Sequence, residues 1–155
     1  MKSVKTFPKG LKAIIATSFI AASMVGCSTA PAATPTAAPP QVVNVSLTTY
    51  GFKFTGDKIK PGEVKFIVKN DATDLQHEIL LVKTDLALDK LPMSSDGTEV
   101  DENSKDYTKV GSVEDVEPGK GGEMTAKLDA GHYIYFCNKA AHYTLKMRGE
   151  FTVAP

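Results

Sequence analysis

The chain is poor in cysteine and histidine, with two cysteines and three histidines among 155 residues. Its longest apolar run, residues 13–26, is too short to span a membrane comfortably. The sequence also lacks an internal repeat, a long amphipathic helix, a phosphate-binding loop and a nucleophile triad. These absences argue against the common enzyme classes, and they leave the few cysteines and histidines as the most informative residues.

Residues 1–26 have the features of a secretion signal: four lysines, an apolar stretch and a small residue before a cleavage point. Val25, Gly26 and Cys27 resemble the end of a bacterial lipobox, although Met24 stands where leucine is usual. We therefore expect Cys27 to be the mature N-terminus and to carry a lipid that anchors the protein to the membrane. The alternative is an ordinary signal peptide that leaves Cys27 free.

Residues 27–40 follow as a segment of proline, alanine and threonine without large apolar side chains. Such a composition does not support a packed structure, so it predicts a semi-extended tether from the acylated Cys27. In a polyproline-like form its reach is on the order of 40 Å. The folded domain is then expected over residues 41–155, a length that suits one hydrophobic core.

Charge is balanced over the whole chain, with 18 basic and 18 acidic residues. Removing the predicted signal, which has four lysines and no acid, leaves 14 basic and 18 acidic residues, a net charge of −4. A mildly acidic protein is unsuited to binding nucleic acid. We expect a monomer on the extracytoplasmic side of the cell membrane, in the periplasm or at the cell surface.

A period-two alternation of apolar and polar residues, punctuated by glycine and proline, predicts an all-β sandwich. The predicted strands cover residues 42–49, 63–69, 77–83, 107–113, 123–128, 133–137 and 149–153. Residues 84–106 break this rhythm with seven acidic residues against two lysines. Leu86, Leu88 and Leu91 would support a short helix there, and the alternative is an exposed acidic loop.

Three residues near the C-terminal end carry metal-binding chemistry, because Cys137, His142 and Met147 follow one another at Cys-x4-His-x4-Met spacing. With His77 they supply one thiolate, two imidazoles and a weak thioether, which is the ligand set of a mononuclear blue-copper centre. If Cys27 carries lipid, Cys137 is a lone thiol in an exported protein. Such a thiol needs burial or a metal to protect it from oxidation.

Strand alternation over residues 133–137 places Tyr133, Tyr135 and Cys137 on one face, the core face, and Ile134 and Phe136 on the other. The residues from Cys137 to Met147 then form a loop that caps one end of the sandwich. His77 must come from another strand.

Each candidate ligand also has a simpler interpretation, since a lone cysteine, histidine or methionine is commonly a core or surface residue. The remaining histidine, His132, follows a turn on the face opposite Cys137, so we expect it to face solvent. Met93 and Met124 are weaker axial candidates. Zinc is a poorer match than copper, because structural zinc sites prefer more thiolates and no thioether.

The stretches EVKFIVKNDATDLQHEILLV around His77 and GHYIYFCNKAAHYTLKMRGEFTV around Cys137 resemble the cupredoxins, the plastocyanin and azurin family. The ligand spacing is most similar to that of the auracyanin and rusticyanin branches. The resemblance implies a Greek-key β-sandwich with one type 1 copper. It also implies that His77, Cys137 and His142 are equatorial ligands and that Met147 is axial.

Two departures from relatives have structural consequences. Ala140 and Ala141 replace the Pro-Gly pair found before the loop histidine in many relatives. We therefore expect a loop less constrained by its own backbone and a Cu–His142 bond that is easier to perturb. Glu78 replaces the asparagine that follows the strand histidine in azurin and plastocyanin. We predict that Glu78 reaches Asn138 and that its charge lowers the reduction potential. The alternative is a Glu78 side chain that turns to solvent.

The resemblance implies one-electron transfer rather than catalysis. Oxidases and reductases that couple a type 1 site to a second copper place a histidine beside the cysteine, whereas Phe136 and Asn138 flank Cys137 here. We expect electrons to leave through His142. We also expect a redox partner, such as a cytochrome or oxidase, to dock on the collar of Ala140, Ala141, Tyr143 and Leu145.

Three points stay open from the sequence. The acidic residues of 84–106 would steer a basic partner, or would simply be solvated. The same ligands would also suit a copper carrier or storage lipoprotein that hands its metal to an acceptor. A metal-free immunoglobulin-like module is a third alternative.

Overall fold

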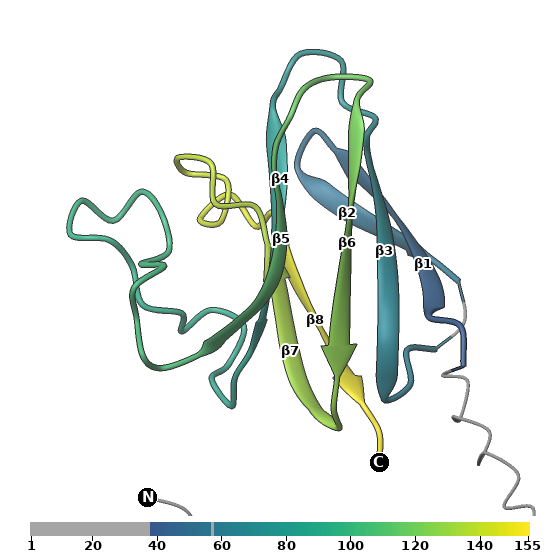
Figure 1. The fold of residues 1–155 in the computed structure, drawn as a ribbon. Helices are drawn as coiled ribbons and strands as arrows, with labels where there is room; N and C mark the ends of the chain where they lie inside the picture. Colours follow the sequence, from purple (N-terminus) through teal and green to yellow (C-terminus); the bar gives the residue numbers. More distant parts are fainter. Residues whose placement is uncertain (1–37, 57) are drawn as a thin grey trace, which may run out of the picture. The chain divides into compact units, whose positions relative to one another are not determined.

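The computed structural model describes residues 38–56 and 58–155, so the predicted signal, Cys27 and most of the predicted tether lie outside the described residues. Two four-stranded sheets face each other (Figure 1), with strand orders β2-β1-β3-β6 and β5-β4-β7-β8. The strands are β1 (Gln41–Thr48), β2 (Gly51–Thr55), β3 (Gly62–Asn70), β4 (His77–Lys83), β5 (Thr108–Val116), β6 (Gly121–Leu128), β7 (Gly131–Phe136) and β8 (Arg148–Val153). The predicted all-β sandwich is confirmed.

The main core lies between the two sheets and follows the period-two pattern of the sequence. In β1 and β3 every second side chain points inward and is buried, while the intervening residues are mostly polar and more exposed. The residues that fill this core from β1, β3 and β6 are Val43, Val45, Leu47, Val64, Phe66, Val68, Met124, Ala126 and Leu128. Alternation therefore places each of these strands with one face on the core.

The sheet that contains β4 and β7 is covered on its outer face as well. Six consecutive residues of β4 are buried, which is typical of a strand with both faces covered. A second apolar cluster lies on this outer face and joins strand residues to side chains of the 84–106 segment: Leu80, Val82, Leu86, Leu88, Leu91, Met93, Val100, Tyr107, Ile134, Phe136 and Tyr143. We call it the outer cluster.

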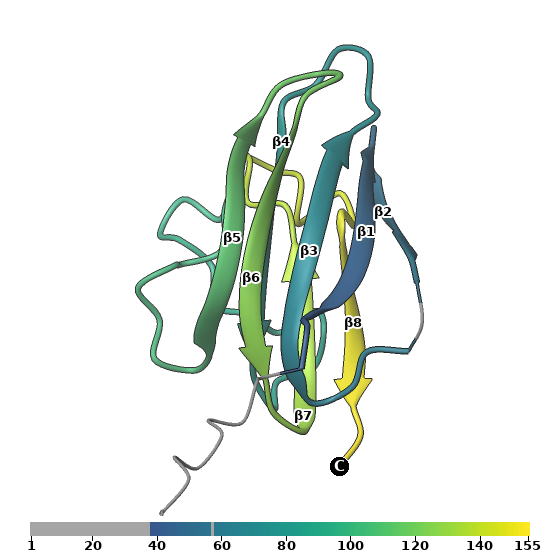
Figure 2. The same cartoon turned by 45° about the vertical axis from the view of Figure 1, so that its right-hand side comes forward.

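Residues 84–106 form a loop, so the predicted short helix is wrong and the loop alternative is correct. The loop is folded back on itself by a bridge between Met93 and Val100. Its acidic side chains are mostly exposed, as expected, but its leucines pack on the sheet. In Figure 2 this segment lies on the β5 side of the sandwich. No helix within residues 38–56 and 58–155 is long and apolar enough to cross a membrane.

One strand, β2, is absent from the sequence prediction. It pairs antiparallel with β1 after a tight turn, and it places the half-buried Phe52 and Phe54 against the core. The parallel β1–β3 pairing shows at which end of the sandwich β1 begins. Gln41 pairs with Val64 at the start of β3, and Leu47 pairs with Asn70 at its end. The chain thus enters at the end of the sandwich opposite to the one where His77 begins β4.

Candidate metal centre

Four predicted ligands come from one end of the β5-β4-β7-β8 sheet. His77 is the first residue of β4, Cys137 directly follows β7, and His142 and Met147 lie in the loop that leads to β8. A donor atom from each of His77, Cys137 and His142 lies within 4.8 Å of the other two. The structure thus brings together three side chains that are up to 65 positions apart in sequence.

The separations suit a bridging ion. The Cys137 Sγ lies 3.2 Å from Nδ1 of His142 and 3.8 Å from Nδ1 of His77. Bonds of first-row metals to imidazole nitrogen and thiolate sulfur are about 2.0 to 2.3 Å long, so one ion can contact all three atoms. Met147 is fully buried in the same cluster as Cys137 and supplies the softer donor expected for copper.

Burial sets the protonation of these donors. Desolvation, helped by the neighbouring His142, lowers the pKa of His77 to about 4, and desolvation also lowers the pKa of His142. Both rings are therefore neutral near pH 7 and keep a lone pair for a metal. Burial raises the pKa of the Cys137 thiol, so without a metal it is a protonated, unreactive group. A bound cation would deprotonate it.

The orphaned nitrogen of His77 is consistent with the same arrangement. Its Nε2 is buried and has no hydrogen-bond partner among the described residues, whereas its Nδ1 faces the sulfur of Cys137. A metal on Nδ1 leaves the ring proton on Nε2. The donor set and the separations therefore fit a copper ion.

Main-chain hydrogen bonds tie the loop ligands to one another. The Cys137 amide donates to the Met147 carbonyl at 3.1 Å, and the Met147 amide donates to the His142 carbonyl at 3.0 Å. The His142 amide donates to Lys139 at 2.9 Å. Because Cys137 and Met147, at the two ends of the loop, are hydrogen-bonded to each other, the loop is closed and its three ligand residues are held close together.

The 84–106 segment braces the ligand loop at Ala141. Ala141 occupies the left-handed region with φ of 67°, a conformation that costs free energy for a residue other than glycine. Its amide donates to the Thr98 carbonyl at 2.8 Å. The 84–106 loop therefore supplies from outside a constraint that the Ala140-Ala141 pair does not supply from its own backbone.

Asn138 is held by the same segment rather than by Glu78. Its side-chain oxygen accepts from the Val100 amide at 2.7 Å, and its side-chain nitrogen donates to the Val100 carbonyl and to Glu102, each at 3.1 Å. These three bonds leave the Asn138 amide no free group for the predicted contact with Glu78. That prediction is wrong.

Glu78 instead pairs with Lys139 at 3.5 Å, and Lys139 also pairs with Asp115 of β5. The β4–β5 register is interrupted between His77 and Ile79, so Glu78 lies in a bulge beside β5. Its side chain is largely buried, which also contradicts the solvent alternative. Burial raises the pKa of Glu78, and the neighbouring Lys139 opposes that rise.

The predicted docking collar needs one correction and one addition. Ala140, Ala141 and Leu145 are exposed, but Tyr143 is buried in the outer cluster and donates its hydroxyl proton to Leu88 at 2.7 Å. The alternation of apolar and polar residues does not predict which of these side chains are buried, because the loop that contains them is irregular. Tyr50, which is 53% exposed, also belongs to this surface although no predicted site contains it.

Tyr50 lies in the β1–β2 turn, with its ring edge-on to His142 at a centroid distance of 6.3 Å. The sequence signal for it was an aromatic residue directly before the turn glycine, outside every predicted strand.

The remaining candidates lie elsewhere. His132 is partly exposed, with Nδ1 2.8 Å from the Thr84 carbonyl and Nε2 3.1 Å from Glu150. It lies outside the ligand cluster, as expected, but these two contacts mean that it is not simply solvated. Met124 lies on β6 in the main core, and Met93 packs in the outer cluster.

Residues 42–154 match the model of the copper binding proteins of the plastocyanin/azurin family. The match covers most of the chain and all four candidate ligands. The protein is therefore a cupredoxin: the chain belongs to the copper-binding plastocyanin/azurin family, and His77, Cys137, His142 and Met147 form its type 1 copper site.

Solved structures show the same fold at low sequence identity. Reduced auracyanin from the photosynthetic bacterium Roseiflexus castenholzii is 21% identical with a TM-score of 0.56, over 77% of this chain and 100% of that one. Auracyanin A, a "blue" copper protein from Chloroflexus aurantiacus, is 21% identical with a TM-score of 0.56, over 74% and 99%. Rusticyanin from Thiobacillus ferrooxidans is 18% identical with a TM-score of 0.51, over 74% and 79%. No curated protein sequence matches the chain significantly.

Proposed function

We propose that the protein transfers single electrons through its type 1 copper, as a membrane-anchored domain on the extracytoplasmic side of the cell. The main support is the closed ligand loop, in which Cys137, His142 and Met147 are joined by their own main-chain hydrogen bonds. Copper supplies a one-electron couple when it is bound. The protein's part is to hold four donors in one arrangement for both oxidation states, which keeps the reorganisation on electron exchange small.

Electrons would leave through His142. Its ring is the most exposed of the four ligands, whereas His77, Cys137 and Met147 are fully buried. Exposed apolar groups of Ala140, Ala141 and Leu145 lie in the same loop, and Tyr50 lies against the ring. A redox protein such as a cytochrome or an oxidase would dock there as the partner.

The burial of three ligands also favours an electron carrier over a copper donor. A protein that hands copper to an acceptor needs an incoming ligand to reach the metal, and here three of the four donor side chains are fully buried. A second copper centre is not expected, because Phe136 and Asn138 flank Cys137. We therefore propose a non-enzymatic carrier that retains its copper through many cycles.

Visible absorption and electron paramagnetic resonance of the copper-loaded protein test the centre directly. We expect an intense thiolate-to-copper band that disappears in Cys137→Ser, while His132→Gln, which changes a histidine outside the site, keeps it. A potential titration and a chelator competition then separate the two functions. Loss of copper to the chelator faster than electron exchange with a cytochrome would contradict the carrier role.

The membrane anchor rests on residues 1–27, and mass spectrometry of the exported protein tests it. We expect the mature chain to begin at Cys27 with a covalent lipid, and Cys27→Ser to release the protein from the membrane fraction. An unmodified N-terminus elsewhere would contradict the anchor and leave the electron-transfer proposal intact.

Steering by the 84–106 loop is part of the same proposal, because its acidic side chains are mostly exposed. Neutralising Asp85, Asp89 and Asp96 should reduce the salt dependence of the rate with a basic cytochrome, since exposed charges act over about 10 Å at 0.1 M salt. An unchanged salt dependence would remove the steering role.

A further inference from the structure

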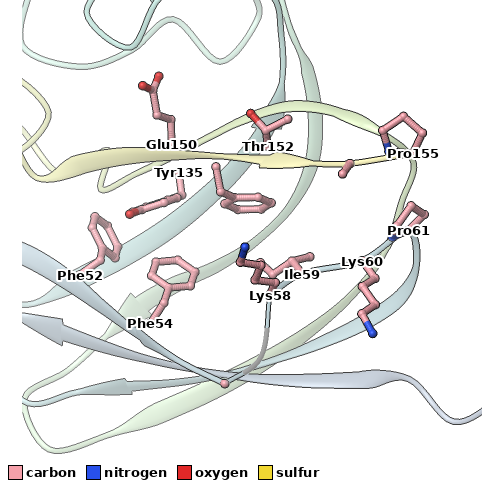
Figure 3. Close-up of a pocket in the computed structure, with 13 residues that line it drawn as sticks. Phe52, Phe54, Lys58, Ile59, Lys60, Pro61, Tyr135, Glu150, Thr152 and Pro155 are labelled. Atoms are coloured by element: carbon pink, nitrogen blue, oxygen red, sulfur yellow. The ribbon is translucent and has the colours of Figure 1, made fainter.

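An open cavity of about 970 Å³ lies on the flank of the sandwich where β2 and β8 are the outermost strands of their sheets. Figure 3 shows aromatic side chains from both sheets turned toward this space, with Phe52 and Phe54 from β2 and Tyr135 from β7. A volume of this size is at the upper end of the range for small-molecule sites, which are mostly apolar with a few polar groups.

The aromatic walls support one another. The centroid of the Tyr135 ring lies 5.2 Å from that of Phe52 and 4.4 Å from that of Phe54. It lies 6.2 Å from the ring centroid of Phe151 of β8, in a stacked arrangement. Such contacts fix ring orientation beyond the effect of burial alone. The cavity therefore presents a preformed apolar wall to a flat ligand.

The basic lip of the cavity is also held in place. The Gln41 side chain donates to the Lys58 carbonyl at 3.0 Å and accepts from the Lys60 amide at 3.0 Å. Ile59, between the two lysines, packs against the main core. Lys58 and Lys60 line the cavity from this clamped segment, and in Figure 3 the Lys58 ammonium is turned toward the rings whereas the Lys60 side chain runs away from them.

Glu150 and Tyr135 also contribute polar groups to the lining. The Glu150 carboxylate points away from the rings in Figure 3 and lies 3.1 Å from Nε2 of His132. The Tyr135 hydroxyl has no hydrogen-bond partner among the described residues. It lies against Gly149 of β8. Two lysines against one carboxylate give the described lining its attraction for negative charge.

We propose that this cavity binds a small planar aromatic molecule that carries an anionic group. The aromatic body would lie against Tyr135, Phe54 and Phe151, and the anion would pair with Lys58, with the exposed Lys60 adding positive charge at the lip. This site is separate from the ligand cluster, although Tyr135 shares the core face of its strand with Cys137. The proposal does not depend on copper or on electron transfer.

Two probes that differ in charge test it on the full copper-loaded chain in its reduced form. 8-Anilinonaphthalene-1-sulfonate is a planar aromatic anion, and N-phenyl-1-naphthylamine has the same ring system without the sulfonate. In fluorescence titrations we expect one saturable site for the anion and at least tenfold weaker binding of the neutral probe. Equal affinities would overturn the anionic specificity.

Variants then locate the site. The double variant Lys58→Gln/Lys60→Gln should abolish the preference for the anion, whereas the matched control Lys53→Gln/Lys127→Gln, on exposed β2 and β6 positions, should keep it. Ala154→Trp fills the cavity from an exposed lining position and should abolish binding of both probes. Anion binding that survives Ala154→Trp, or a preference that survives the first double variant, would overturn the proposal.

Amide chemical shifts keep this test independent of misfolding. In each variant the amides of β3 and β6 that lie away from the substituted residues should match those of the unmodified protein. On addition of the anion, shifts should be confined to the segments around residues 52–61, 135 and 150–155. Shifts centred on Tyr50 and Leu145 instead would place the probe on the docking collar and would also overturn the proposal.

Discussion

The outer faces of the two sheets have opposite surroundings. On the β2-β1-β3-β6 sheet the outward side chains meet solvent, and Val42 and Ile67 are 47% and 41% exposed. On the β5-β4-β7-β8 sheet the outward Ile134 and Phe136 are fully buried by the 84–106 loop. The covered sheet is the one whose strands position the copper ligands. The difference indicates that the loop serves the metal site rather than the sandwich in general.

The cover is connected to the ligand loop by hydrogen bonds as well as by packing. Thr98 accepts from Ala141, Val100 exchanges two bonds with Asn138, and Leu88 accepts from Tyr143. The residues on the ligand-loop side flank both Cys137 and His142. The loop from Cys137 to Met147 is therefore held by the sheet on one side and by 84–106 on the other.

The largest expected effect compares the two outer faces directly. Phe136→Ala should lower the free energy of unfolding by about 3 to 5 kcal/mol, because it opens a cavity in the outer cluster. Ile67→Ala, on the exposed outer face, should cost less than about 1 kcal/mol. Chemical denaturation of the metal-free protein measures both. Similar costs for the two variants would contradict the difference between the faces.

Acid should weaken the metal-free protein through His77. Its folded pKa of about 4 lies below the unfolded value of 6.5, so the unfolded chain binds more protons between these values. Stability is retained above pH 6.5 and is lost as the pH falls toward 4, by up to roughly 3 kcal/mol.

Denaturation of the metal-free protein across this pH range measures the loss, and His77→Phe should flatten the dependence. Copper should also protect against acid, since it binds the neutral ring. A stability that is constant from pH 6.5 to 4 would contradict this assignment.

Asn138→Ala tests the link between the cover and the ligand loop. It removes three hydrogen bonds and leaves the main-chain groups of Val100 without partners, which should cost about 1 to 3 kcal/mol. Copper should also dissociate faster, as followed by the decay of the visible band with a chelator. Asn103→Ala changes an exposed asparagine in the same loop and serves as the control. Equal dissociation rates in the two variants would separate the loop from metal retention.

The smallest effect concerns the charges beside the copper. Glu78→Gln removes an anion that favours Cu(II), so the reduction potential should rise, by an amount on the order of tens of millivolts because Lys139 already offsets part of the charge. Lys139→Gln should shift the potential in the opposite direction. Glu63 lies at the start of β3, at the end of the sandwich remote from the copper ligands. Glu63→Gln should therefore leave the reduction potential unchanged in the same voltammetric measurement. No shift in either of the first two variants would contradict the proposed electrostatic effect.

The parts of the structure that depend on local pattern were predicted well. The alternation in β1, β3 and β6 places their strands within a few residues, and the spacing of Cys137, His142 and Met147 identifies the ligand loop. The parts that depend on tertiary context were not. β2 is short and its Phe52 and Phe54 are only half-buried, so its pattern is weak.

The positions of Glu78 and Tyr143 depend on the 84–106 loop or on a bulge in β4. Neither leaves a periodic signal in the sequence, because the partners are set by long-range packing. The apolar contacts between the 84–106 loop and the sheet were not predicted for the same reason, because they too depend on long-range packing.

The parallel pairing of β1 with β3 has a consequence for how the protein would work at a surface. Because Gln41 pairs with the start of β3, the N-terminal end of the described domain lies at the end of the sandwich remote from His77. An attachment there would leave the half-buried imidazole of His142 at the opposite end of the domain, away from the point of attachment.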